Sequence, residues 1–371
     1  MNEIIFIANY PTEWLKQDGA SIRFLAIDEI FSDFNRTYVE SFNFPFVNYL
    51  YYWYRDIKRG YNKLPEPNNN KIKSYKYLTK KQTIKMFENA KIIYIENFTN
   101  LAKLDLNLIK KYGYKMVLDF HGCVIEEMEM MNAPKWKIDN MRKYEECALK
   151  NIKTFVSVTN NMTEYYKNKY PESKDSRYIL LPIYNDSKIN CEEKIYTERI
   201  NIIYSGRNYI WQNSELMIAT IAKIVKQNAE SIFNFTFLTP DIIEFKEIAA
   251  RYGVEDKITF KSVPPDKLND EYSKAHLGFI LRDNNTVNRV ACPTKLVEYM
   301  KAGIIPVVMQ PEIGDFNKIG YKYILNSDLI AGNLLNFEQL QEMQKINYEI
   351  IEKYSAVIND NKTKLQSLLA N

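Results

Sequence analysis

The chain has 371 residues, of which 46% are hydrophobic, and its formal net charge is +4 at pH 7. This length allows two domains with separate cores, and the near balance of charge excludes a protein that binds polyanions over its whole surface. The start, MNEIIFIANY, lacks the pattern of a secretory signal peptide, and no run of apolar residues approaches the ~20 needed to cross a bilayer. A cytoplasmic protein is therefore expected.

Short apolar segments alternate with segments of helical periodicity along the chain, which is typical of parallel α/β sheets. In the first half we predict strands at residues 4–8, 91–95, 115–120, 154–158 and 178–181. In the second half we predict them at residues 201–205, 233–238, 257–260, 277–281, 304–309 and 322–325. The order predicts an α/β fold in which each half builds its own sheet.

Residues 184–198 are polar, have no periodicity and precede a fresh strand, so they predict a linker between two domains. The first domain is expected over residues 1–183 and the second over residues 199–350. The tract 337–371 has helical spacing as one helix or two, and residues 351–371 are long enough to pack back on the first domain.

The segment NRVACPTKLVEYMKAGIIPVV, residues 288–308, predicts a helix with Pro293 at its first position and Gly303 as its C-terminal cap, followed by a buried strand. Lys295 then lies in the first turn, against the positive end of the helix dipole. A phosphate bound at the helix N-terminus would make this position favourable, whereas the alternative is a solvated surface lysine. We favour the phosphate site.

Other candidate residues follow predicted strands. Gly19 and Ala20 precede a helix after the first strand, His121 and Gly122 follow the third, and Ser205, Gly206 and Arg207 follow the first strand of the second half. Small residues allow close approach of a ligand, and an arginine fork fits a diphosphate. Ordinary turns and surface ion pairs are the alternatives, as is an ion pair of Glu298 with Lys295 one helical turn away.

The four cysteines show no metal-ligand or redox spacing, so neither a structural zinc nor a disulfide framework is predicted. Cys292, next to Pro293, is interpreted as a small residue close to a bound phosphate, with a reactive thiol as the less favoured alternative. Asp-x-Asp, G-x-G-x-x-G, the P-loop pattern and Gly-x-Ser-x-Gly are all absent from the sequence. The sequence thus lacks the motif by which many sugar transferases bind a metal ion with the donor diphosphate, and it lacks the dinucleotide-binding motif of dehydrogenases.

The order of the Gly19 loop, DFHG, YSGR, GFILRDN and PTKLVEYMKAGIIPVV resembles the two-domain GT-B glycosyltransferases, in particular the group 1 or family 4-like branch that builds bacterial surface glycans. The resemblance covers nearly the whole chain. It implies two Rossmann-like domains facing each other across a cleft, with a C-terminal helix packing back on the first. It also implies a nucleotide-sugar donor, a polysaccharide or lipid-linked glycan acceptor, and retention of anomeric configuration without a metal cofactor.

The resemblance also assigns roles to single residues. Arg207 and Lys295 would hold the donor diphosphate, Glu298 the ribose, and His121 the donor sugar, so that His121, Arg207 and Lys295 form the expected catalytic set. The other expected donor-binding residues are Gly19, Ala20, Ser205, Gly206, Arg282, Cys292, Pro293 and Thr294.

Two positions depart from the family pattern. Val290 stands where the first glutamate of the E-x7-E motif is expected, and Gln212 where a lysine is usual. Arg282 or Arg289 could compensate for the lost cation. These departures keep two alternatives open, namely a nucleotide-sugar epimerase of the same fold and a catalytically silent subunit that binds a sugar nucleotide or a glycan.

The region 42–85 combines aromatic residues with many lysines and arginines. This pattern suits the surface of an anionic membrane carrying a lipid-linked acceptor, and peripheral attachment to the inner face of the plasma membrane would follow. The alternatives are a partly buried aromatic helix with solvated lysines and, least favoured, single-stranded nucleic acid.

Overall fold

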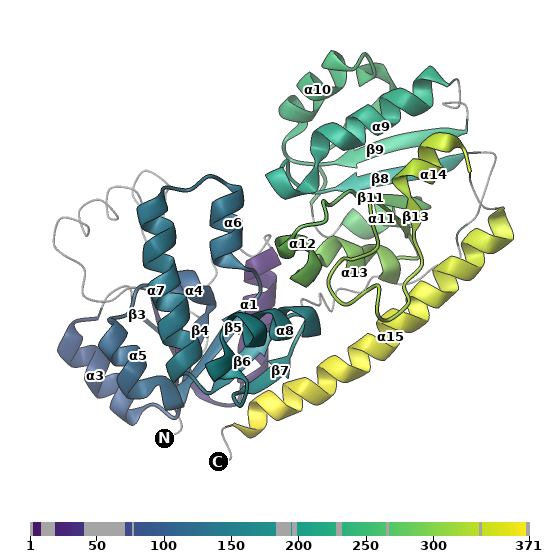
Figure 1. The fold of residues 1–371 in the computed structure, drawn as a ribbon. Helices are drawn as coiled ribbons and strands as arrows, with labels where there is room; N and C mark the ends of the chain where they lie inside the picture. The colour runs from purple at the N-terminus through teal and green to yellow at the C-terminus, as the bar shows by residue number, and fades with distance from the viewer. Residues whose placement is uncertain are drawn as a thin grey trace. The chain divides into compact units, whose positions relative to one another are not determined.

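The computed structural model describes residues 3–8, 19–40, 71–75, 78–182, 194, 199–227, 232–264, 267–333 and 336–368 (Figure 1). The chain divides into two compact units, of which unit 1 comprises Met1–Ile183 and Ile358–Asn371 and unit 2 comprises Tyr184–Val357. The predicted linker, residues 184–198, lies outside the described residues except for Lys194, so it stays a prediction.

Unit 1 contains a parallel sheet of seven strands in the order β3-β2-β1-β4-β5-β6-β7. Its strands are β1 (Glu3–Ile7), β2 (Asn35–Val39), β3 (Ile72–Tyr75), β4 (Ile92–Glu96), β5 (Met116–Phe120), β6 (Thr154–Ser157) and β7 (Arg177–Leu180). Its helices are α1 (Gly19–Ile30), α3 (Lys80–Asn89), α4 (Asn97–Leu101), α5 (Leu106–Tyr112), α6 (Val124–Met130), α7 (Lys135–Asn151) and α8 (Asn160–Lys169). The strand order reverses between β1 and β4.

The predicted strands of the first half are confirmed within two residues, but β2 and β3 were missed. In β2 the buried Arg36 forms an ion pair with Asp28 at 2.8 Å. A charged residue therefore occupies a core position of this strand, and it interrupts the run of apolar residues by which strands were predicted. Strand β3 is a short edge strand with alternate exposed residues, and edge strands carry little hydrophobic signal.

Unit 2 contains a parallel sheet of six strands in the order β10-β9-β8-β11-β12-β13. Its strands are β8 (Ile200–Ser205), β9 (Phe233–Leu238), β10 (Ile258–Lys261), β11 (Leu277–Ile280), β12 (Ile305–Val308) and β13 (Ile324–Leu325). Its helices are α9 (Ser214–Lys226), α10 (Ile242–Arg251), α11 (Leu268–Tyr272), α12 (Thr286–Val290), α13 (Thr294–Lys301) and α14 (Asn326–Ala331). Every strand predicted in the second half is present, and the strand order reverses between β8 and β11.

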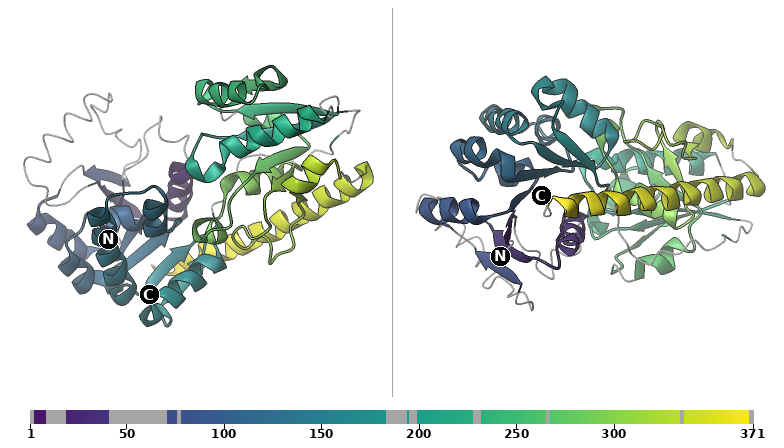
Figure 2. Two further views of the ribbon diagram at one scale, coloured as in Figure 1. Left: turned by 45° about the horizontal axis from the view of Figure 1, so that its top comes forward. Right: turned by 90° about the horizontal axis from the view of Figure 1, so that it is seen from below.

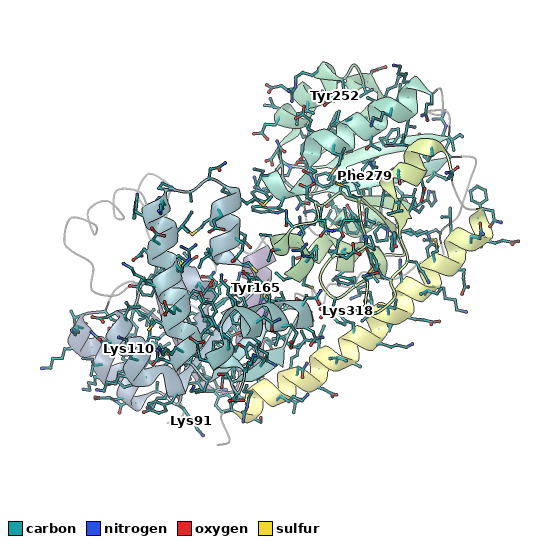
Figure 3. The ribbon with its side chains drawn as sticks, in the orientation of Figure 1. Lys91, Lys110, Tyr165, Tyr252, Phe279 and Lys318 are labelled. Carbon is teal, nitrogen blue, oxygen red and sulfur yellow. The ribbon has the colours of Figure 1, made fainter. Side chains whose placement is uncertain are left out.

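Aromatic side chains fill both cores. In unit 1 the rings of Phe6 and Tyr38 stack with centroids 4.9 Å apart. In unit 2 Phe237 packs against Phe279, which Figure 3 labels within the dense side chains around the second sheet. Burial of this apolar area on both faces of a parallel sheet is the main stabilising contribution to each unit.

The C-terminal tract is one helix, α15 (Phe337–Ser367), which is continuous in all the views of Figures 1 and 2. In unit 2 the side-chain oxygen of Asn347 accepts a hydrogen bond from the Lys322 N–H at 2.7 Å. In unit 1 Asn361 donates to the Leu180 carbonyl and Gln366 to the Ile30 carbonyl, both at 2.7 Å. The prediction that the last helix packs back on the first domain is confirmed.

Candidate functional site

The predicted site residues of unit 2 gather at the carboxyl edge of its sheet, where the strand order reverses. Ser205 ends β8, and Gly206 follows it with φ +143°, a conformation that favours glycine. Arg282 comes two residues after the end of the neighbouring strand β11. In open α/β sheets this reversal is the usual position of a ligand.

Gly206 provides room for the side chain of Lys295. A Cβ atom added at Gly206 would collide with both Cε and Nζ of Lys295. The same ammonium lies over the ring of Tyr204, 5.7 Å from its centroid, at a distance that permits a cation–π interaction. The Lys295 ammonium is therefore held against the backbone that follows β8.

Lys295 belongs to the first turn of α13, as predicted. Pro293 is the N-cap residue rather than the first helical residue, and no side chain of the described chain caps this helix N-terminus. Among the described residues the N–H groups of Thr294 and Lys295 have no backbone partner, since the first bonds back to Pro293 come from Leu296 and Val297. A helix N-terminus with free N–H groups and an adjacent ammonium favours an anion.

The charge on Lys295 is stabilised little by its surroundings in the protein. Burial and the positive field of Arg282 lower the pKa of Lys295 to about 8, and Glu298 opposes this only in part. The ion pair between Lys295 and Glu298, which was the alternative to a ligand contact, is not formed, and the Glu298 carboxylate instead accepts a hydrogen bond from Tyr272 at 3.1 Å. Burial raises the pKa of Glu298, which Lys295 and Tyr272 counteract.

Two buried tyrosines fix the backbone after β8. Tyr299 accepts a hydrogen bond from the Ser205 N–H at 2.9 Å, and Tyr204 donates to the Arg207 carbonyl at 2.7 Å. Tyr299 reaches this position because Gly278 in β11 has no side chain, and a Cβ there would collide with the Tyr299 ring. These contacts fix the position of the backbone at this edge.

The two arginines at this edge of the sheet, Arg207 and Arg282, differ in exposure and in their partners. Arg207 is 53% exposed and forms an ion pair with Asp241 at 3.2 Å, while Asp241 also accepts the Asn208 N–H at 2.9 Å. Arg282 is buried and donates to the side-chain oxygen of Asn288 at 3.2 Å. Arg207 can therefore turn toward a ligand, whereas Arg282 contributes a fixed positive charge.

The departures from the family pattern lie close to this edge. Gln212 and Val290 are buried. Arg289 is exposed and donates to Asn284 and Thr286 at 3.0 and 3.3 Å. Of the two arginines proposed to compensate for a lost cation, Arg282 is the one whose charge acts on Lys295.

The remaining predicted residues belong to unit 1. Gly19 and Ala20 open α1. His121 follows β5, and its Nδ1 atom is buried without a hydrogen-bond partner among the residues that the structure describes. Burial lowers the pKa of His121 to about 4, with Asp119 opposing and Arg23 adding to the shift, so the imidazole is neutral at pH 7.

A buried ion pair fixes the strand end next to His121. Arg23 of α1 donates to Asp119 through Nε and Nη2 at 3.1 and 2.7 Å, and to the Leu181 carbonyl at 2.6 Å. Tyr94 donates to the same carboxylate at 2.7 Å. The network ties α1 to the carboxyl ends of β4 and β5.

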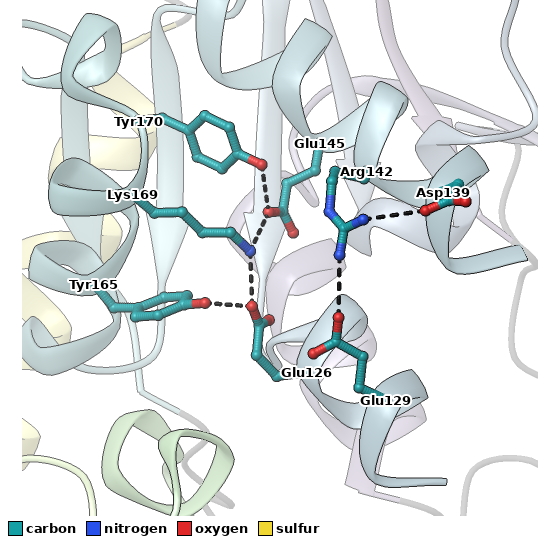
Figure 4. Close-up of polar contacts among 8 residues, drawn as sticks. All are labelled: Glu126, Glu129, Asp139, Arg142, Glu145, Tyr165, Lys169 and Tyr170. Atoms are coloured by element: carbon teal, nitrogen blue, oxygen red, sulfur yellow. Dashed lines mark hydrogen bonds and ion pairs between the residues drawn. The ribbon is translucent and has the colours of Figure 1, made fainter. Parts of the chain in front are cut away.

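Helix α6, which begins just after the His121–Gly122 turn, is held by a shared lysine (Figure 4). The Lys169 ammonium lies 2.7 Å from both Glu126 of α6 and Glu145 of α7. Tyr165 donates to Glu126, and Tyr170 donates to Glu145 at 2.9 Å. Burial alone would lower the pKa of Lys169, but the two carboxylates outweigh it and raise that pKa.

The sequence matches no family model, and the search of curated proteins found no match. Solved structures do match over the whole chain. A sucrose-phosphate synthase of Thermosynechococcus elongatus has 13% identity and a TM-score of 0.68, with 100% of both chains covered. HepE of Anabaena, solved with UDP and glucose, has 12% identity and a TM-score of 0.67, again with 100% of both chains covered. WaaG, a glycosyltransferase involved in lipopolysaccharide biosynthesis, has 11% identity and a TM-score of 0.60, with 99% of both chains covered.

The chain has the GT-B fold. Its two parallel sheets and its C-terminal helix are those that the resemblance implied. At 10 to 14% identity the likeness to solved structures shows this fold and not the activity. The roles assigned to the site residues stay predictions.

Sequence reasoning missed the polar residues that support the candidate site. Tyr204 lies under the Lys295 ammonium, and Tyr272 donates to Glu298. Tyr299 accepts the N–H of Ser205 at the end of β8, and Asp241 forms an ion pair with Arg207. Tyrosines in strands and helices look like ordinary core residues. Gly206 was identified from the sequence, whereas Gly278, a glycine inside a predicted strand, was an available signal of close packing that was not used.

Proposed function

We propose that this protein is a glycosyltransferase that binds a nucleotide-sugar donor at the carboxyl edge of the unit 2 sheet. One observation carries the proposal. The Lys295 ammonium lies against Gly206 at an uncapped helix N-terminus, and no carboxylate of the described residues is in ion-pair distance of it. A diphosphate would supply the missing negative charge to both the ammonium and the free N–H groups.

The other residues then take the following roles. Lys295 and Arg207 bind the diphosphate, which competes with Asp241 for the exposed guanidinium. Glu298, oriented by Tyr272, accepts hydrogen bonds from the ribose hydroxyls. The resemblance assigns the contact with the donor sugar to His121, whose imidazole is neutral at pH 7. UDP as the donor nucleotide is supported by similar structures that were solved with UDP, UDP-glucose and a fluorinated UDP-glucose.

In this proposal the bond between the sugar and the diphosphate breaks as negative charge gathers on the departing diphosphate. Preorganised cations and N–H groups stabilise that charge, which is often the largest contribution to such catalysis. Lys295, Arg207 and Arg282 supply three positive charges there, so we propose a metal-independent reaction. Retention of configuration follows from the resemblance.

We further propose that the acceptor is a polysaccharide or a lipid-linked glycan at the cytoplasmic face of the membrane. A surface glycan is supported by the similar structure of WaaG, a glycosyltransferase involved in lipopolysaccharide biosynthesis. TarM of S. aureus, another similar structure, was solved with α-GlcNAc-glycerol and UDP. No helix in the described part of the chain combines the length and apolarity needed to cross a bilayer. The membrane-binding region predicted over residues 42–85 falls mostly on residues outside the description.

The test is calorimetric binding of UDP, GDP, CDP and ADP to the purified protein, with and without EDTA. We expect selective binding of one nucleotide that persists in EDTA. Lys295→Ala should weaken it about 10- to 100-fold, the effect of losing one hydrogen bond to a charged group. Lys301→Ala, at the other end of the same helix, is the matched control and should bind as the wild type does.

Two results would contradict the proposal. Unchanged affinity in Lys295→Ala would show that the nucleotide binds elsewhere. No binding of any nucleotide at millimolar concentration would remove the donor site altogether.

A further inference from the structure

The loop between β8 and α9 carries a pair of stacked aromatic rings, of which Tyr209 is exposed and Trp211 is partly buried. The rings of Tyr209 and Trp211 have centroids 4.9 Å apart and an interplanar angle of 22°. Tyr209 is 48% exposed, and its neighbour Ile210 is 57% exposed. Tyr209 and Ile210 together present a small apolar surface to solvent, and proteins use exposed apolar surface for interactions.

The loop holds these rings in place without help from a ligand. Tyr209 donates its N–H to the Arg207 carbonyl at 3.0 Å and accepts the Gln212 N–H at 2.9 Å. Gln212 is buried, and Asn213 reaches the sulfur of Met309 beyond β12 at 3.8 Å. The protein itself therefore fixes the backbone that carries both rings, so little backbone conformational entropy is lost when something binds there.

The topology of the sheet determines which part of a donor this pair faces. The connection from β8 to β9 and the connection from β11 to β12 step in opposite directions along the sheet (Figure 1). Because both crossovers are right-handed, α9 and α13 cover opposite faces. Glu298 lies on α13, whereas residues 208–213 lead from the sheet edge toward α9.

A nucleotide sugar has its diphosphate in the middle, its nucleoside at one end and its sugar at the other. With the diphosphate at Gly206 and Lys295 and the ribose at Glu298, the nucleoside extends toward α13. The sugar end then extends the other way, toward the loop that carries Tyr209 and Trp211.

We infer that Tyr209 and Trp211 form a stacking platform for a sugar ring, either the transferred sugar or the acceptor sugar next to it. A pyranose has an apolar C–H face, which packs on an aromatic ring, and a rim of hydroxyls. Tyrosine and tryptophan suit such a ligand because each joins a flat apolar body to one polar group. This inference rests on the proposed function, since it takes the position of the diphosphate from it.

The test is saturation-transfer NMR on the full chain with the methyl glycosides of glucose, galactose, mannose and N-acetylglucosamine, in the presence of saturating UDP. We expect saturation of the ring C–H protons of at least one glycoside. Tyr209→Leu and Trp211→Leu should each weaken that binding at least about fivefold, the scale of one ring-stacking contact. UDP affinity, measured separately, should stay within about twofold because the platform lies beyond the diphosphate.

Matched variants separate stacking from general effects. Tyr209→Phe and Trp211→Phe keep a flat ring and should retain most of the glycoside binding. Trp136→Leu and Tyr252→Leu remove exposed aromatic residues elsewhere and should change nothing. Thermal unfolding of each variant reports whether it is folded.

Three results would overturn the inference. The first is that glycoside signals persist in Trp211→Leu. The second is that Tyr209→Leu and Trp211→Leu lose UDP affinity along with glycoside binding, which would assign the rings to the nucleobase. The third is that the wild type binds UDP but binds no glycoside. The last result would leave the proposed function standing. Failure of UDP itself to bind would instead refute the proposed function, and the platform with it.

Discussion

Raising the pH should release the nucleotide, because in the proposed function the Lys295 ammonium binds its diphosphate. With a pKa of about 8, the protonated fraction of Lys295 falls from about three quarters at pH 7.5 to about 3% at pH 9.5. UDP affinity should therefore fall by up to about 25-fold, or about 2 kcal/mol, over this range. The phosphate is already fully ionised there, with its last pKa near 6.

The tyrosines next to Lys295 do not titrate in this pH range, so they do not contribute to the pH dependence of UDP affinity. Burial raises the pKa of both Tyr204 and Tyr299, so these hydroxyls stay neutral throughout the range. Calorimetry in two buffers of different ionisation enthalpy should show uptake of about half a proton per UDP at pH 8, since the diphosphate restores the charge of Lys295. Lys295→Arg should bind UDP with no such pH dependence, because a guanidinium stays protonated.

The stability of the free protein should change in the opposite direction. The pKa of Lys295 lies below its ordinary value of 10.5, so the unfolded chain binds this proton more tightly. The cost of the buried charge is fully present below pH 8 and is relieved as the pH rises toward 10.5. UDP affinity that is flat from pH 7.5 to 9.5, without proton uptake, would refute the reasoning.

Two further changes test the packing around the sites. Gly206→Ala adds a Cβ that collides with Lys295 at a φ of +143°, so UDP affinity should drop at least about tenfold and stability by about 1 to 3 kcal/mol. Calorimetry that finds wild-type affinity would show that Lys295 does not need this position. Lys169→Met leaves the carboxylates of Glu126 and Glu145 without their shared cation, and urea unfolding should show a loss of about 3 to 5 kcal/mol. Adding Glu145→Gln should recover part of that loss, and a single variant as stable as the wild type would show that the two carboxyl groups do not need the cation.

The sequence predicted those parts of the fold that depend on local pattern. Runs of apolar residues located every strand of unit 2, and Pro293 with Gly303 located α13 within one or two residues. Gly303 has φ +69°, the cap conformation that the sequence indicated. Strand β2 was missed because Arg36 satisfies its charge with Asp28, a contact between residues of different elements.

The candidate site was predicted as a set of residues but not as an arrangement. Lys295 was predicted as a phosphate-binding residue from its position in the first turn of a helix, and neighbouring residues in the sequence are enough to predict that position. The ion pair of Arg207 with Asp241 joins residues 34 positions apart, and the bond of Tyr299 to Ser205 joins residues 94 apart. Partners at such separations are set by the strand order and leave no periodic signal in the sequence.

The space left by Gly278 links two positions of the chain that are 21 residues apart, because Tyr299 fills it and bonds the Ser205 N–H. A larger residue at 278 would expel the ring, and a smaller residue at 299 would leave a void beside β11. The two positions should therefore vary together among related sequences, with glycine present wherever tyrosine is. Such covariation would locate the same sheet edge in relatives whose lysine and arginine motifs have diverged beyond recognition.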